Sequence, residues 1–343
     1  MRSRRLPPFL CLFLPALTLA PASHADEVLL VNGDRLTGRI VSKAGNTLII
    51  KTEYAGKVSV RWDQVKGVST KSPVTVMTAG GDLLKSAQLS APEPERIGIA
   101  NTEGGGRTVK RQDIAFINPK PEQSGHGVSY SGRVNVSAAS VRGNSESDRV
   151  YADGALNARA KDYAWGLGMK IERRKENDVK TAQRWLLDGN YDHFVDSRHF
   201  IYARTSLEQD KFKDIQLRTT VGGGYGWQIY ENDQTKLSLR TGLDYVNLDR
   251  DTGEDEDYPA LGWGVRASHW LLDRRAELFH EQDGFWSLSD SEELTIRSKT
   301  GVRLPIAAGI TASAQLNADW DRTPAPGRKS TDTTMLLGLG YAW

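Results

Sequence analysis

The sequence is almost without cysteine. Cys11 is the only one among 343 residues, and it lies close to the N-terminus. The rest of the chain therefore has no thiol for a disulfide framework, for nucleophilic catalysis or for a cysteine-ligated metal site.

Long hydrophobic runs and an excess of one charge are also missing. The mean hydropathy is -0.49, and after the N-terminal segment no stretch approaches the roughly 20 apolar residues that a membrane-spanning helix needs. Lys and Arg number 45 against 43 Asp and Glu, a net charge of +2. This balance gives no electrostatic reason to expect a nucleic-acid partner.

The one sustained apolar run is at the N-terminus. Three arginines within the first five residues precede an apolar stretch from Phe9 to Leu19, and the small residues Ser23 and Ala25 follow. This order is typical of a secretory signal peptide, so we expect residues 1–25 to be removed and the mature chain to start at Asp26. A membrane anchor is the alternative, but the run is short and contains Pro15.

Residues 26–118 contain an internal repeat of about 48 residues. The first copy runs from Val28-Leu29-Leu30 to Val65–Val68, and the second from Val74-Thr75-Val76 to Ile114–Ile117. Gly-Asp between apolar runs indicates tight hairpins. We expect a periplasmic β-rich module of two SH3- or Sm-like copies, serving as an adaptor for a protein partner or as a ligand-binding module. Residues 119–126 form the expected linker.

From residue 127 to residue 343 the chain divides into about twelve alternating segments, each long enough to cross a bilayer as a strand. An even strand number, and short turns that alternate with longer loops, are typical of bacterial outer-membrane β-barrels. The ninth segment alternates poorly. The expected strands are 128–142, 148–160, 163–174, 181–194, 198–210, 215–230, 236–248, 259–272, 276–287, 292–304, 309–321 and 332–343.

The chain ends on a strand with apolar residues at every second position, and Leu339, Tyr341 and Trp343 resemble the assembly signal of outer-membrane barrels. Other aromatic residues are expected on the outer face in two girdles near the membrane interfaces. The expected partners are outer-membrane lipid and lipopolysaccharide, with the barrel assembly machinery during biogenesis. The girdle residues are Trp165, Tyr191, Tyr225, Trp227, Tyr341 and Trp343 near one rim, and Trp185, Tyr245, Trp263 and Trp320 near the other.

The segment Asp319–Gly327, followed by Thr331-Asp332-Thr333 and the last strand, resembles the C-terminal signature of the YdiY-like family, as does the turn Gly143–Ser147. This is a domain-of-unknown-function family described as salt-induced outer-membrane proteins. The resemblance covers about residues 127–343. It implies a barrel in the outer membrane and no established biochemical activity.

Charged residues alternate along the faces that we expect to point into the barrel. Buried charges must be paired or solvated, so two hypotheses follow. Either ion pairs close the lumen of a non-conducting structural or envelope-stress protein, or surplus basic residues line a narrow solute channel that favours anions. The candidate lumen residues are Arg184, Asp188, Arg204, Glu208, Arg218, Arg240, Asp244, Arg266, Arg297, Lys299 and Arg303.

An enzymatic function is the weakest hypothesis. An outer-membrane lipid hydrolase would need a Ser/His pair, but the adjacent Ser268 and His269 must face opposite sides of a strand. The acidic segment Asp249–Asp257 lacks the spacing of an EF-hand. We therefore expect no catalytic residues, no cofactor and no metal site.

Overall fold

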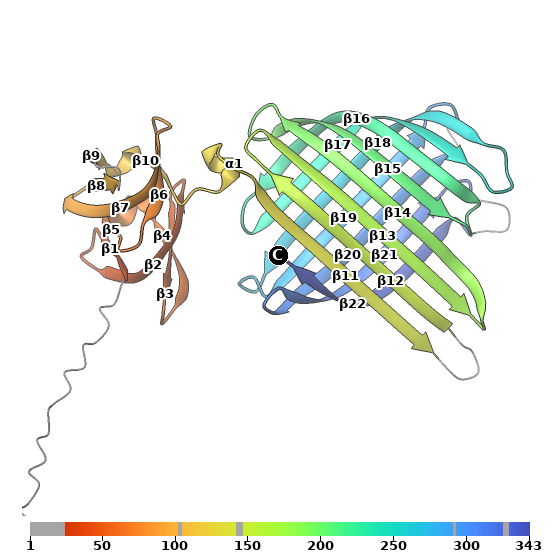
Figure 1. Cartoon of the computed structure of the whole chain (residues 1–343), viewed down its shortest axis with the longest axis horizontal. Coiled ribbons are helices and arrows are strands. Elements are labelled where there is room, and N and C mark those ends of the chain that lie inside the picture. The colour runs from red at the N-terminus through yellow and green to blue at the C-terminus, as the bar shows by residue number, and fades with distance from the viewer. Residues whose placement is uncertain (1–24, 102–104, 142–146, 291–292, 325–328) are drawn as a thin grey trace, which may run out of the picture. The chain divides into compact units, whose positions relative to one another are not determined.

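The computed structural model of the protein describes residues 25–101, 105–141, 147–290, 293–324 and 329–343. The chain divides into two compact units, Met1–Pro119 and Lys120–Trp343, and Figure 1 displays both. Residues 1–24 of the expected signal peptide, residues 143–146 of the turn Gly143–Ser147 and residues 325–327 of the segment Asp319–Gly327 lie outside the described residues. No helix in the described ranges is long and apolar enough to cross a membrane.

The first unit is a β-module whose strands form a ten-stranded sheet in the order β4-β3-β2-β10-β6-β7-β8-β9, with β1 paired to β2 and β5. Its 3-10 turns are η1 (Trp62–Gln64) and η2 (Arg111–Asp113). The strands are β1 (Asp26–Leu30), β2 (Arg35–Ala44), β3 (Thr47–Thr52), β4 (Gly56–Arg61), β5 (Val65–Ser69), β6 (Val74–Thr78), β7 (Leu83–Glu93), β8 (Arg96–Asn101), β9 (Gly106–Lys110) and β10 (Ile114–Ile117).

The module is duplicated in structure as well as in sequence. In each copy a 3-10 turn separates the fourth strand from the fifth: η1 precedes β5, and η2 precedes β10. Alternate residues of the strands point into one aliphatic core, which includes Val28, Ile50, Ile97 and Ile114. Burial of these side chains supplies the main driving force for folding of the module.

Lys43 joins the two copies. Its side chain is buried, and Nζ donates hydrogen bonds to the carbonyl oxygens of Ile114 (2.5 Å) and Ala115 (2.9 Å). The ammonium group also lies 5.1 Å from the ring centre of Trp62. Burial, and secondarily the charge of Arg111, lower the pKa of Lys43 below its usual value.

The second unit begins with a short helix, α1 (Pro121–Ser124), and continues as a closed antiparallel barrel of twelve strands. The predicted fold class is therefore confirmed, and each strand end lies within three residues of its expected position. The strands are β11 (Ser129–Val141), β12 (Ser147–Arg159), β13 (Tyr163–Glu176), β14 (Val179–Phe194), β15 (His199–Asp210), β16 (Ile215–Glu231), β17 (Thr235–Asp249), β18 (Glu256–Leu271), β19 (Ala276–Ser287), β20 (Leu294–Ala307), β21 (Ile310–Asp321) and β22 (Thr331–Ala342).

The barrel closes where the last strand meets the first. Paired residues of β11 and β22 run from Arg133 opposite Ala342 to Val136 opposite Leu339. Beyond them, the backbone N–H of Trp343 donates to the Gly132 carbonyl at 3.1 Å. The Trp343 ring occupies the space that a Cβ would need at Gly132. Glycine at this position therefore leaves room for the terminal aromatic ring.

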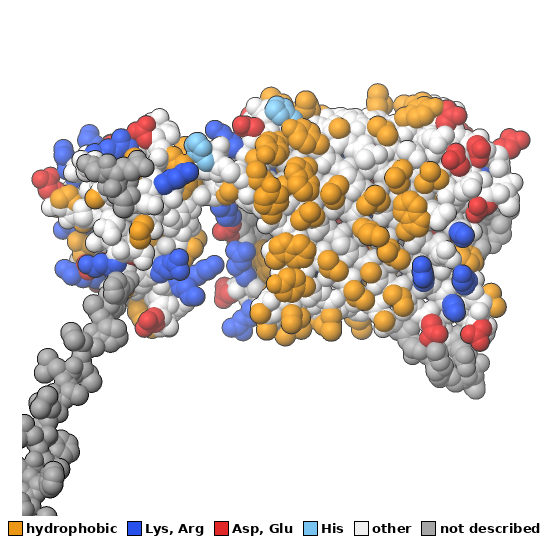
Figure 2. Space-filling model, in the orientation of Figure 1, with side chains coloured by type: hydrophobic (Ala, Val, Ile, Leu, Met, Phe, Trp, Pro, Cys, Tyr) orange, Lys and Arg blue, Asp and Glu red, His pale blue; other side chains and the backbone are white. Residues whose placement is uncertain are grey.

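The outer surface of the barrel is apolar. Figure 2 shows hydrophobic side chains over the visible barrel wall, with charged groups gathered toward its two ends. Leu243, Met335 and Leu337 are each more than three-fifths exposed. This distribution follows from strand alternation, because residues two apart point to the same side.

Strand β19 alternates poorly in sequence because it also carries aromatic residues on its inward face. Leu278 and Trp286 face outward, which places Phe279 and Phe285 inside the barrel among charged groups. The guanidinium carbon of Arg303 lies 3.6 Å from the ring centre of Phe279, and that of Arg204 lies 4.7 Å from the ring centre of Phe285. The inward aromatic residues thus serve as faces for cation–π contacts.

Candidate functional site: the barrel interior

The barrel encloses a cavity of about 880 Å³. We call the barrel end where β11 begins and β22 ends the terminal end. Arg159, Glu231 and Trp343 line the cavity at the terminal end, while Asp321 and Lys329 line it at the opposite end. The cavity therefore extends along the whole barrel between these two groups of residues.

The predicted lumen residues lie inside the barrel, where most line this cavity. Glu208 borders a small adjoining cavity, and Asp244 is buried against the wall beneath Arg204. Those lining the main cavity are Arg184, Asp188, Arg204, Arg218, Arg240, Arg266, Arg297, Lys299 and Arg303.

Glu208 is the centre of the first cluster of charges. Its carboxylate lies 2.8 Å from Arg184, 2.5 Å from Arg297 and 3.6 Å from Arg218, and its side chain is 2 % exposed. Arg184 also pairs with Asp319. Glu208 is on β15 and Arg297 on β20, with four strands between them around the shorter side of the barrel. Their ion pair therefore crosses the lumen.

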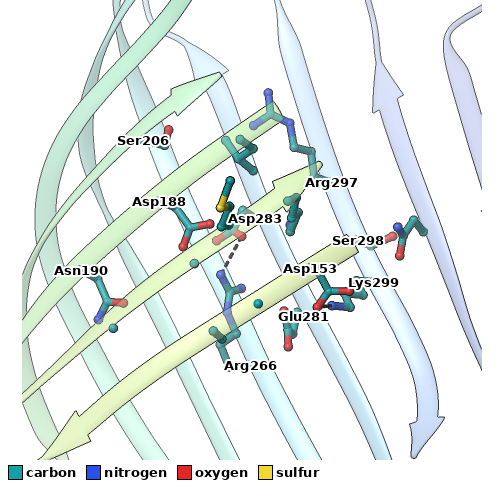
Figure 3. A pocket seen from close by; sticks show the side chains of 18 of the residues that line it. Asp153, Asp188, Asn190, Ser206, Arg266, Glu281, Asp283, Arg297, Ser298 and Lys299 are labelled. Atoms are coloured by element: carbon teal, nitrogen blue, oxygen red, sulfur yellow. Dashed lines mark hydrogen bonds and ion pairs between the residues drawn. The ribbon is translucent and has the colours of Figure 1, made fainter. Parts of the chain in front are cut away.

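A second cluster lies on strands β14 to β19. Arg204 donates two hydrogen bonds to Asp244, at 2.8 and 2.6 Å, in the two-pronged geometry that suits a guanidinium and a carboxylate. Arg266 pairs with Asp283 at 2.7 Å, the contact drawn as a dashed line in Figure 3. Arg240 is held more loosely, 4.0 Å from Asp192.

A third cluster connects strands on both sides of the barrel closure. Lys299 on β20 lies 2.9 Å from Asp153 on β12; Figure 3 shows both side chains, with Glu281 nearby. Arg133 on β11 pairs with Glu281 on β19 at 2.6 Å, and Arg303 pairs with Glu277 at 2.9 Å. The Lys299–Asp153 and Arg133–Glu281 contacts cross the closure and reinforce the region where β11 and β22 share few backbone pairs.

Several members of these clusters were missed in the sequence. They are Arg133, Asp153, Glu277, Glu281 and Asp283. The signal was present in β19, because fixing Leu278 and Trp286 as outward residues places its three carboxylates on the inward face. With these acids included, every predicted lumen cation has a carboxylate oxygen within 4.0 Å.

Inward glycines let some charged side chains lie flat against the wall. A Cβ at Gly222 or Gly262 would collide with the Asp244 carboxylate, and one at Gly168 would lie 2.5 Å from Asp188 Oδ2. Gly222 thus makes room for a charged group, while Gly224 lies against the backbone of Thr241. Side chains seated in this way occupy less of the lumen.

Ser268 and His269, the adjacent pair considered for a hydrolase, make different contacts. Ser268 lines the cavity, whereas His269 bonds through Nδ1 to the Thr235 hydroxyl at 2.8 Å. No group of three His, Cys, Asp or Glu residues in the described ranges could hold a metal ion. In the acidic segment 249–257, Arg250 pairs with Glu256 at 2.8 Å.

The barrel is the part of the chain that a known protein family matches. A family model described as "Protein of unknown function, DUF481" matches residues 134–343. The chain belongs to this family. The curated protein "Uncharacterized protein YdiY" of Escherichia coli (strain K12) is 21% identical over 216 residues, which are 62% of this chain and 83% of that protein. The resemblance found in the sequence is therefore confirmed.

Two solved structures are similar to the chain at low identity. The translocator domain of autotransporter NalP from Neisseria meningitidis matches with a TM-score of 0.37 and 14% identity, over 63% of this chain and 88% of that one. The COG4313 outer membrane channel from Pseudomonas putida F1 matches with a TM-score of 0.39 and 11% identity, over 62% and 94%.

Proposed function

We propose that this DUF481 member is a narrow channel of the bacterial outer membrane that passes small polar solutes through an arginine-rich lumen. The observation that carries the proposal is the cavity of about 880 Å³, whose lining runs from Arg159 and Glu231 at one end to Asp321 and Lys329 at the other. A barrel interior packed solid with side chains would leave no such continuous space.

Placement in the outer membrane is supported by the surface. Apolar side chains cover the barrel wall and charged groups gather at its ends, as a barrel in lipid requires. The N-terminal signal sequence would direct the chain out of the cytoplasm, and the terminal strand carries the expected assembly signal Leu339, Tyr341 and Trp343. In this placement the module at 26–118 is periplasmic, and the opposite barrel end meets lipopolysaccharide.

The dimensions favour small solutes. The cavity amounts to about 880 Å³ over the whole length of the barrel. The Glu208 cluster narrows the passage further, because Arg297 and Glu208 meet across the lumen at 2.5 Å. Solutes the size of an inorganic anion or a small organic acid would pass such an opening.

Charge compensation limits the selectivity. The predicted excess of basic groups would favour anions, but each guanidinium group of the predicted set has a carboxylate partner, as described above. We therefore expect a modest anion preference. The cross-lumen ion pairs also favour the second hypothesis, a non-conducting structural protein whose activity lies in the periplasmic module.

Single-channel recording of the refolded mature protein in planar bilayers separates the two hypotheses. The channel predicts discrete conductance steps, and Arg297→Ala should enlarge the steps and reduce the anion preference, since it removes one guanidinium group from the ion pair that crosses the lumen. Arg198→Ala, in an exposed turn outside the lumen, is the matched control and should leave both quantities unchanged.

Silence from the wild type and from Arg297→Ala, in samples that retain the heat-modifiable gel migration of a folded barrel, would contradict the channel. The non-conducting alternative would then stand.

A further inference from the structure

Three basic residues form a straight row across the first copy of the module. Arg39 on β2 is directly opposite Lys51 on β3, and Lys51 is directly opposite Lys57 on the edge strand β4. All three side chains are exposed. We call these residues the basic row. With strands about 4.8 Å apart, the basic row is about 10 Å long.

The basic row is unfavourable for the isolated module. Like charges that are directly opposite on neighbouring strands repel one another. Other basic residues of the module have acidic partners, such as Arg35 with Glu27 at 3.2 Å and Arg107 with Asp82 at 3.0 Å. No member of the basic row forms an ion pair with any residue in the described ranges. A negatively charged partner from outside the chain would relieve this repulsion.

The second copy of the module provides an internal control. The equivalent row there is Gln88 on β7, Ala100 on β8 and Gly106 on β9, paired in the same order. These residues are exposed and uncharged. The fold therefore does not need cations at these register positions. A lysine on an edge strand also blocks unwanted strand pairing, but that role does not account for Arg39 and Lys51 on interior strands.

An exposed aromatic residue lies next to the basic row. Tyr54, 71% exposed, is in the turn that connects β3 to β4. The turn thus places Tyr54 three residues along the chain from both Lys51 and Lys57. Tyrosine is enriched at membrane–water interfaces, and lysine or arginine beside it attracts anionic lipid headgroups.

We propose that the basic row and Tyr54 form a docking surface for anionic phospholipid headgroups. A membrane surface fits best because the module combines a flat row of unpaired cations with a nearby exposed tyrosine, and the same chain carries a barrel. Because the barrel keeps the module tethered to a bilayer, even weak contacts acquire a high effective concentration. The second copy, with its neutral row, stays free for other contacts.

The test uses residues 26–118, which contain their own continuous aliphatic core, and sedimentation with vesicles of phosphatidylethanolamine and phosphatidylglycerol. The variant Arg39→Gln/Lys51→Ala/Lys57→Gln copies the neutral character of the second row. The control Lys66→Gln/Lys85→Gln/Lys110→Gln removes the same charge from exposed positions elsewhere on the module. Circular dichroism verifies that each variant folds.

We expect the Arg39→Gln/Lys51→Ala/Lys57→Gln variant to bind vesicles about 100-fold more weakly than the wild type. Each basic residue near an anionic surface contributes about 1 kcal/mol of binding free energy. The control should retain most of the binding, and Tyr54→Ser should weaken it to a smaller extent. Added salt should reduce wild-type binding. No binding by the wild type, equal losses in both triple variants, or binding of a soluble polyanion without binding of vesicles would overturn the proposal.

Discussion

In the N-terminal module, the strand residues that point inward are aliphatic, whereas in the barrel the inward residues are largely charged. Ile50 and Ile97 fill the core of the module, and Arg204 and Glu208 occupy the inside of the barrel. The period of two is the same in both regions. The difference lies in which side of the sheet meets an apolar environment, because the module surrounds its own core while the barrel exposes its apolar face to lipid.

The two regions also differ in how they hold buried charge. The module contains a buried lysine, Lys43, whose ammonium group is held by two backbone carbonyls and an aromatic ring. The barrel instead balances clusters of guanidinium and carboxylate groups, such as the three arginines around Glu208. An isolated charge can thus be satisfied by carbonyl dipoles, while a dense set of charges requires counter-charges.

The largest expected effect comes from removing a counter-charge inside the barrel. Glu208→Ala leaves Arg184, Arg218 and Arg297 without their shared partner, and we expect a loss of about 3–5 kcal/mol of unfolding free energy. Urea unfolding of the refolded barrel in lipid vesicles measures it. Glu231→Ala at the half-exposed rim, where Arg159 is the partner, should cost about 1 kcal/mol or less. Equal losses would contradict the role of burial.

A matched pair of surface substitutions tests what each outer face contacts. Leu243 on the barrel is 62% exposed and Val31 on the module is 60% exposed. Leu243→Arg should cost about 2–4 kcal/mol because the barrel face meets lipid. Val31→Arg should change stability by about 0.5 kcal/mol or less, since that side chain is in water. Unfolding in lipid vesicles measures the first and thermal unfolding of residues 26–118 the second.

If Leu243→Arg proved as harmless as Val31→Arg, the barrel surface would not be in contact with lipid at that level.

The smallest effect concerns the buried lysine of the module. Lys43→Met keeps the apolar stem and removes the ammonium group, leaving two carbonyl acceptors unpaired at a cost of about 1–3 kcal/mol. The pKa of Lys43 is lowered in the folded module, so between that pKa and its usual 10.5 the unfolded chain binds more protons. The stability of the wild type relative to Lys43→Met should therefore rise with pH in this window.

Urea unfolding of residues 26–118 at a series of pH values measures that difference. A stability difference that stays constant with pH would show that Lys43 titrates as it does in the unfolded chain.

The sequence by itself determined the architecture of both regions. The alternation of apolar residues, the turn residues and the repeat of about 48 residues were sufficient to predict the twelve strands and the duplicated module. These features could be predicted because they depend on neighbours within a strand or hairpin. The same local signal placed Leu339, Tyr341 and Trp343 on the last strand, where β22 closes the barrel against β11.

Only the tertiary structure decided which charges meet. Arg133 contacts Glu281 and Lys299 contacts Asp153 across more than 140 positions of sequence, and nothing local in the chain encodes such distances. The barrel brings these residues together because its strands close into a ring, so that each pairing depends on the register of several intervening strands. The sequence alone therefore determined which residues point into the barrel, and closure of the barrel determined which of these residues form ion pairs.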